Sequence, residues 1–217
     1  MADPVQLQGW RYSVYTRIAR LALLSKQVEH ETIEVDPFAE LPEAYLRLHA
    51  FGRVPVLTHG AFRLFETGAI TRYVDRAFPG RPLQPEGAAA LARMDQVISV
   101  VDSYAYWPLI RQVSSHGFFR PRFGEKSSRE EIDAGLEASG KVLSFLDGVA
   151  LEGIVLDGRE LTLADCHLAP MIDYFVRAGE GEAALSSHFA LKEWWDRMSV
   201  LDVMTATDPF AVEAAPV

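Results

Sequence analysis

The chain has 217 residues, of which 49% are hydrophobic and 24% charged, the balance of a globular protein with one large or two small domains. Its 21 basic and 30 acidic residues give a net charge of −9, which argues against nucleic acid as a partner, because nucleic-acid-binding surfaces are basic. Any anionic ligand must therefore be held by local donors and not by the overall field.

No segment approaches the roughly 20 apolar residues that span a bilayer, and residues 1–8 lack the apolar run of a secretion signal, so we expect no membrane association. Cys166 is the single cysteine, which excludes an internal disulfide and fits a reducing, cytoplasmic setting. Because it falls inside a predicted helix, we expect it to be a buried core residue. The six histidines show no paired ligand spacing, so we expect no metal site.

Residues 1–80 mix strand and helix patterns. Short apolar or alternating runs predict strands over 5–10, 29–35, 54–57 and 62–65. Apolar residues at helical spacing predict helices over 15–26 and 67–78, with a short helix at 43–49. Pro55 has no N–H for a sheet ladder, so it belongs to an edge strand or to the start of a strand. This order of elements predicts a small α/β domain with a mixed sheet.

Residues 81–87 are rich in proline and glycine and predict a linker, and the patterns after it are almost wholly helical. A long helix is expected over 88–113, which Pro108 should kink or divide. Further helices should begin at Ser128 and Thr162, each followed three residues later by an acidic residue as in a capping box. Another is expected over 191–198, where Trp194 and Trp195 should serve packing. Residues 88–217 are therefore expected to form an all-helical domain.

Three short segments of the first domain, 12–17, 51–57 and 64–70, carry groups that can hold a charged thiol. Ser13 precedes a helix, where its hydroxyl can cap free N–H groups or donate to a thiolate. Lowering a thiol pKa by about 2 units takes about 2.7 kcal/mol, which a charge-assisted hydrogen bond plus a helix end can supply. At the next helix start, Thr67 and free N–H groups can bind a carboxylate, and Glu66 can pair with an amine. Taken alone, Ser13 and Thr67 are each explained as plain N-caps.

Together the three segments resemble the cytosolic glutathione transferase family. Residues 13–17 are similar to its serine-type Ser-x-x-x-Arg turn. Residues 52–57 read Gly-Arg-Val-Pro-Val-Leu, similar to its Gly-Lys-Val-Pro-Val-Leu, and residues 64–70 resemble its Leu-Phe-Glu-Ser-x-Ala-Ile. The resemblance implies a thioredoxin-like, glutathione-binding domain over 1–80, a linker over 81–87, and an all-helical domain over 88–217 that forms the electrophile site.

The resemblance also implies roles for individual residues. Ser13 would donate a hydrogen bond to the glutathione sulfur. Val54, ahead of a cis-proline at Pro55, would pair its backbone with the cysteinyl unit. Glu66 and Thr67 would hold the γ-glutamyl amine and carboxylate.

Two parts of the family pattern stay open. The basic residue that the family uses for the glycyl carboxylate has no clear match, and Arg53 or His49 are the substitutes. Tyr12 is an alternative to Ser13, because some branches of the family use tyrosine.

The electrophile pocket is expected to be apolar and aromatic. Tyr12, Tyr104 and Trp107 are its candidates. Of the three aromatic residues on the long helix, Tyr104, Tyr106 and Trp107, two can equally be core or dimer contacts.

The resemblance implies a transferase that acts in detoxification: the thiolate of glutathione, the co-substrate, attacks a small hydrophobic electrophile. It also implies a homodimer and a reaction without a metal. Two alternatives remain: a glutathione-dependent isomerase, dehalogenase or peroxidase, and a non-catalytic binding or regulatory protein on the same fold. The sequence does not indicate the physiological electrophile.

Overall fold

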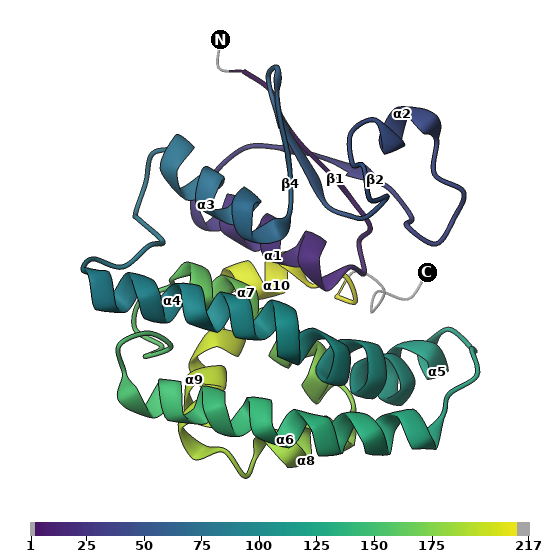
Figure 1. The fold of residues 1–217 in the computed structure, drawn as a ribbon, viewed down its shortest axis with the longest axis vertical. Coiled ribbons are helices and arrows are strands. Elements are labelled where there is room, and N and C mark those ends of the chain that lie inside the picture. Colours follow the sequence, from purple (N-terminus) through teal and green to yellow (C-terminus); the bar gives the residue numbers. More distant parts are fainter. Residues whose placement is uncertain (1–2, 212–217) are drawn as a thin grey trace. The chain divides into compact units, whose positions relative to one another are not determined.

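The computed structural model describes residues 3–211 and divides into two compact units (Figure 1). One unit comprises the described residues up to Leu83 together with residues 202–211. The other unit is Gln84–Leu201. Within the described residues, no helix is both long and apolar enough to cross a membrane.

A four-stranded mixed sheet forms the base of the first unit. Its strands are β1 (Val5–Gly9), β2 (Glu31–Glu34), β3 (Val56–His59) and β4 (Phe62–Phe65), in the order β2-β1-β3-β4. β1 is parallel to β2 and antiparallel to β3, and β3 and β4 form a hairpin. Each strand that the sequence predicts is present. β3 is an inner strand, but it begins one residue after Pro55, so the missing N–H of the proline falls outside the ladder.

The helices of this unit are α1 (Val14–Ser25), α2 (Glu43–Leu46), α3 (Thr67–Ala77) and α10 (Asp202–Thr207). Figure 1 shows α1 and α3 next to each other, with α2 carried separately by the loop after β2. α10 packs on α1, where the buried Arg17 donates to the carbonyl of Met204 at 3.1 Å and to the hydroxyl of Thr207 at 3.4 Å. No pattern in the sequence indicates that the helix at 202–207 joins the first unit.

A buried ion pair connects α1, α3 and the segment after α3. Lys26 Nζ lies 3.1 Å from Asp75 Oδ1, and both side chains are almost fully buried. Lys26 also donates to the carbonyl of Arg81 at 3.0 Å, and the Leu83 N–H donates to Asp75 at 2.7 Å. These bonds hold the end of the first unit against its two main helices.

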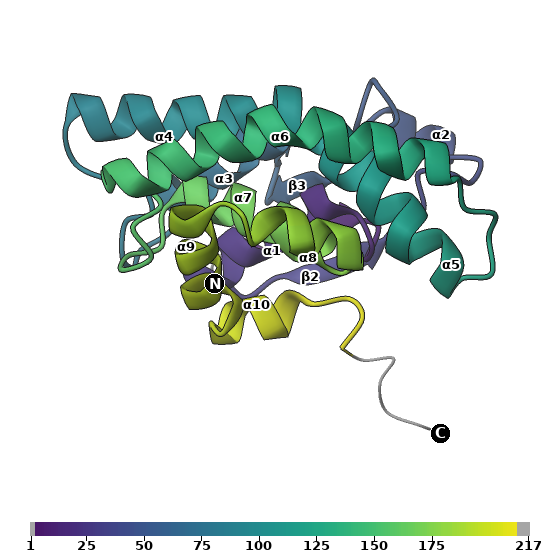
Figure 2. The same ribbon diagram turned by 90° about the horizontal axis from the view of Figure 1, so that it is seen from below.

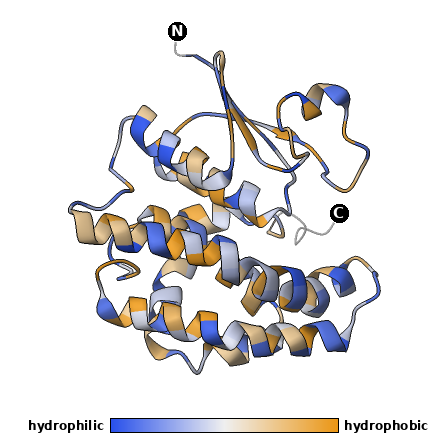
Figure 3. Cartoon of the chain, in the orientation of Figure 1, coloured by the Kyte–Doolittle hydropathy of each residue, from blue (hydrophilic) through white to orange (hydrophobic). Residues whose placement is uncertain are grey.

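All regular secondary structure of the second unit is helical. Its helices are α4 (Ala88–Val100), η1 (Val101–Phe119), α5 (Arg120–Arg122), α6 (Arg129–Glu152), α7 (Leu163–Val176), α8 (Gly179–Leu185) and α9 (Phe189–Ser199). α6 packs along η1, the helix that continues α4 (Figure 2). α7 is buried along nearly its whole length and forms the core. The outer helices carry both apolar and polar residues, as one-sided burial requires (Figure 3).

Pro108 does not divide the long helix, although division is one of the two outcomes that the sequence predicts. The chain continues through η1, a π-type helix with Pro108 inside. Proline has no N–H for an i→i−5 bond either, so Pro108 still removes one backbone hydrogen bond, and the wider turns around it are a local departure from α-helical geometry.

The predicted helix starts are confirmed by their caps. Ser128 accepts from the Glu131 N–H at 3.3 Å, and α6 then extends to Glu152. Thr162 and Asp165 form a full capping box. Cys166, one residue further, is fully buried as predicted.

Candidate functional site

Three segments that the sequence singles out meet at one end of the sheet. In the strand register, Val56 at the start of β3 pairs with Gln8 of β1 on one side and with Phe65 of β4 on the other. Because β3 is antiparallel to both neighbours, its beginning lies beside their ends. The turn after β1, the Val54–Pro55 bond before β3 and the helix start after β4 are therefore adjacent.

Ser13 is the N-cap of α1. Its Oγ accepts a hydrogen bond from the Thr16 N–H at 3.3 Å, and the side chain is half-buried. A serine hydroxyl has one hydrogen and two lone pairs, so accepting this bond leaves the O–H free to donate. Capping and donation to a ligand, which the sequence leaves as alternatives, are therefore compatible at the same oxygen. The N-terminus of α1 also favours a negative charge at this place.

Two other hydroxyls lie near Ser13. The Thr16 side chain is 1% exposed, so its hydroxyl is out of reach of a ligand. Tyr12 is half-buried, and its ring lies 5.3 Å from that of Trp10 and 5.4 Å from that of Phe210. These contacts place Tyr12 within an aromatic cluster of the first unit.

The peptide bond between Val54 and Pro55 is cis, as the resemblance predicts. The loop before it is held by Tyr45 of α2, whose hydroxyl donates to the carbonyl of Arg53 at 2.7 Å. Burial raises the pKa of Tyr45 to about 12, so this hydroxyl keeps its proton. Sequence reasoning missed Tyr45, because a tyrosine in a short amphipathic helix carries no sign of a contact with a neighbouring loop.

The start of α3 presents two free polar groups. Glu66 has φ +69°, a region that few residues other than glycine adopt, and its exposed carboxylate has no hydrogen bond or ion pair with any residue in 3–211. The hydroxyl of the buried Thr67 likewise has no hydrogen-bond partner in this range. No side chain caps α3, so its first N–H groups are open to an anion. A carboxylate beside an anion site suits the amine and carboxylate of an amino acid.

His49 is buried to 2% exposure, and its ring stacks on that of Phe65 with 4.3 Å between the centroids. Its Nδ1 accepts from the Phe51 N–H at 3.2 Å. Burial lowers the pKa of His49, against the opposing charge of Glu66, so the ring is neutral at neutral pH. A neutral ring attracts a carboxylate less than the exposed guanidinium of Arg53 does.

Tyr104 and Trp107 belong to the second unit, on η1, where they are 66% and 61% exposed. They are therefore not core residues of that unit.

Trp194 is core, as expected, but it also donates its indole N–H to the buried carboxylate of Asp165 at 2.7 Å. Within residues 3–211, no group of three or more His, Cys, Asp or Glu side chains is arranged to hold a metal ion.

Two family models match the chain. Residues 7–82 match the glutathione S-transferase N-terminal domain, and residues 106–202 match the glutathione S-transferase C-terminal domain.

Individual glutathione S-transferases are similar to this chain over nearly its whole length. Glutathione S-transferase F12 of Arabidopsis thaliana is 27% identical over 199 residues, which is 90% of this chain and 92% of that protein. Probable glutathione S-transferase GSTF1 of Oryza sativa subsp. japonica is 29% identical and covers 90% of this chain and 91% of its own.

Among solved structures, glutathione S-transferase III in its apo form has a TM-score of 0.82 at 25% identity, with 99% of this chain and 98% of that chain covered. Glutathione transferase F2 from Populus trichocarpa has a TM-score of 0.81 at 25% identity and covers 97% of this chain and 100% of its own.

Proposed function

The chain belongs to the glutathione S-transferase family, and we propose that it conjugates the glutathione thiolate, stabilised by Ser13, to a small hydrophobic electrophile. The observation that carries this proposal is the free hydroxyl hydrogen of Ser13 at the N-terminus of α1, beside the cis Val54–Pro55 bond.

Ser13 would act on the charge of the sulfur. Its O–H donates to the thiolate while its oxygen keeps the Thr16 N–H, so the helix start stays capped as the ligand binds. A charge-assisted hydrogen bond contributes about 1.5–3 kcal/mol, which favours the anion over the neutral thiol. The thiolate then attacks the electrophilic carbon, and the leaving group departs with the displaced electron pair.

The rest of glutathione would lie across the same end of the sheet. The backbone of Val54 pairs with the cysteinyl unit, and Glu66 and Thr67 hold the γ-glutamyl amine and carboxylate. For the glycyl carboxylate we favour Arg53 over His49, because burial keeps His49 neutral.

The electrophile would be apolar or aromatic, with Tyr104 and Trp107 as its contacts and Tyr12 as a further candidate. Conjugation of such compounds is a detoxification reaction. No metal takes part in this scheme, and the cytoplasmic setting stays a prediction from cysteine usage.

We also propose a homodimer. Phe51 is 71% exposed on the loop that precedes the cis bond, and Leu46 and Phe62 of the same unit are also exposed. Exposed aromatic side chains of this size are typical of interface contacts. Light scattering should give twice the chain mass, and Phe51→Ser should shift it toward the monomer.

The test of the catalytic assignment compares Ser13→Ala with Tyr12→Phe, using glutathione and a chlorinated nitroaromatic. Ser13→Ala should lower kcat by about 10- to 100-fold, since 1.4 kcal/mol corresponds to a factor of ten, while the KM for glutathione changes little. Tyr12→Phe should keep the rate within about twofold. An unchanged kcat in Ser13→Ala, or a large loss in Tyr12→Phe, would transfer the role away from Ser13.

A further inference from the structure

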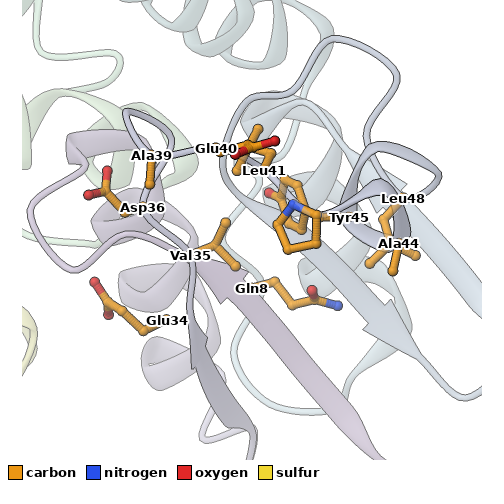
Figure 4. A pocket seen from close by; sticks show the side chains of 11 residues that line it. Gln8, Glu34, Val35, Asp36, Ala39, Glu40, Leu41, Ala44, Tyr45 and Leu48 are labelled. Atoms are coloured by element: carbon orange, nitrogen blue, oxygen red, sulfur yellow. The ribbon is translucent and has the colours of Figure 1, made fainter.

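A cavity of about 370 Å³ lies in the first unit, between the end of β2, the loop after it and α2 (Figure 4). This size is within the range of about 300–1,000 Å³ that small-molecule pockets occupy. No residue assigned above to glutathione or to the electrophile lines it. The cavity is therefore a separate feature of the unit, and binding of a ligand there does not depend on the proposed function.

The chain around this cavity is strongly acidic. Residues 27–46 contain six carboxylates, at positions 29, 31, 34, 36, 40 and 43, and no lysine or arginine. Three of them, Glu34, Asp36 and Glu40, line the cavity. Arg11 Nε lies 4.0 Å from Glu34 and offsets part of this charge, so Asp36 and Glu40 are the lining carboxylates without an ion pair among the described residues. Carboxylates beside a partly enclosed space attract the opposite charge. The electrostatics thus favour a cation and disfavour an anion.

The hydrogen bonds show which polar groups are available. Glu34 accepts from the backbone N–H of Arg11 at 3.0 Å, and Asp36 accepts from the N–H of Phe38 at 2.9 Å. Glu40 has no hydrogen bond or ion pair with any other residue in the described range, and neither has the side-chain amide of Gln8. A carboxylate and an amide oxygen that both lack partners are suitable acceptors for an ammonium group.

The remaining wall is apolar. Val35, Leu41, Pro42, Ala44 and Leu48 supply aliphatic surface around the ring of Tyr45. The Tyr45 hydroxyl already donates to Arg53, so only the ring is presented to the cavity. The ammonium ion alone would leave this apolar surface in contact with water. The cavity therefore favours a ligand that also has an apolar part.

We propose that this cavity binds a small amphipathic organic cation of the alkylamine class. Its ammonium group lies against the Glu40 carboxylate, and its carbon chain covers Leu41 and the Tyr45 ring. The site also adjoins the cis-proline segment, because Gln8 pairs with Val56 and Tyr45 holds Arg53.

The test measures binding of hexylamine to the full chain by calorimetry, with hexan-1-ol and hexanoate as neutral and anionic probes of equal length. Hexylamine should bind at least about tenfold more tightly than either, because only it carries the positive charge. Glu40→Gln should weaken hexylamine by about fivefold to tenfold. Ala44→Trp, which fills the cavity from α2, should abolish binding.

Glu29→Gln is the matched control. It removes one carboxylate from the same acidic segment, but Glu29 is exposed and does not line the cavity. It should leave hexylamine binding within about twofold, as expected for a distant, solvent-screened charge. The proposal is wrong if millimolar hexylamine does not bind, if hexan-1-ol binds equally well, or if Glu29→Gln and Glu40→Gln weaken binding alike. It is also wrong if a folded Ala44→Trp chain binds hexylamine normally.

Discussion

A Cβ atom on Gly9 would lie 2.5 Å from Oγ1 and 2.6 Å from Cγ2 of Thr16, both far inside van der Waals contact. Gly9 ends β1, and Thr16 lies in the first turn of α1 and donates its N–H to Ser13. The close approach of strand and helix therefore sets the position of the Ser13 hydroxyl. It leaves the Thr16 hydroxyl buried without a hydrogen-bond partner in residues 3–211.

Gly9→Ala should push the first turn of α1 away from the sheet and so displace Ser13. We expect kcat to fall by about tenfold or more, since a misplacement of about 1 Å is enough for such a loss. At saturating glutathione, the apparent pKa in the pH profile of kcat/KM for the electrophile should rise, because a displaced hydroxyl stabilises the bound thiolate less. Both quantities come from steady-state rates measured across pH.

The control for this prediction is Thr16→Ala, which removes the two atoms that a Cβ on Gly9 would approach most closely and leaves only the Cβ of residue 16, at 3.1 Å. In the Gly9→Ala background it should restore most of the rate, and alone it should change kcat by no more than about twofold. If the double variant is as slow as Gly9→Ala, the close approach does not position Ser13.

Much of the first unit could be predicted from the sequence, because proline, glycine and apolar spacing mark its strands and helices locally. The cis bond and the three adjacent segments followed from the resemblance. The Arg17 bond to Thr207 could not be predicted, since it joins residues 190 positions apart without any pattern. The positive φ of Glu66 was equally hidden, because nothing in a Phe-Glu-Thr sequence distinguishes it from an ordinary helix start.

The Thr67 hydroxyl offers a direct test of the glutathione site. Thr67→Ala should raise the Kd for glutathione by about tenfold, the effect of one lost hydrogen bond to a carboxylate, while kcat at saturation stays close to the original. Thr67→Ser, which keeps the hydroxyl, should bind glutathione almost normally. Equal affinity in both variants, measured by calorimetry, would place the carboxylate elsewhere.

The indole N–H of Trp194 should contribute to stability through Asp165. This carboxylate is fully buried, and burial raises its pKa while hydrogen bonds from Thr162 and Trp194 oppose that effect. Trp194→Phe keeps a ring but removes the donor, so the free energy of unfolding should fall by about 1–3 kcal/mol beyond the packing loss. Trp195→Phe, at a neighbouring buried position with no hydrogen bond among residues 3–211, measures the packing loss alone. Equal losses in urea unfolding would contradict this role.

His49 should make the loop before the cis bond sensitive to acid. Its folded-state pKa lies below the ordinary value of about 6.5, so the unfolded chain takes up the proton first. The free energy of unfolding should therefore fall as the pH drops from about 6.5 toward the folded pKa, and stay unaffected by this group at higher pH. Protonation also costs Nδ1 its lone pair, and with it the bond from the Phe51 N–H.

His49→Asn separates this effect from other titrating groups. The amide oxygen of asparagine can accept from the Phe51 N–H but does not titrate, so the variant should lose less stability than the original chain between about pH 7.5 and pH 5.5. Burial also lowers the pKa of His116. Because His116 is present in both chains, its effect cancels in the comparison. Urea unfolding at the two pH values gives the difference directly. Parallel pH dependences in the two chains would mean that His49 contributes nothing to the acid response.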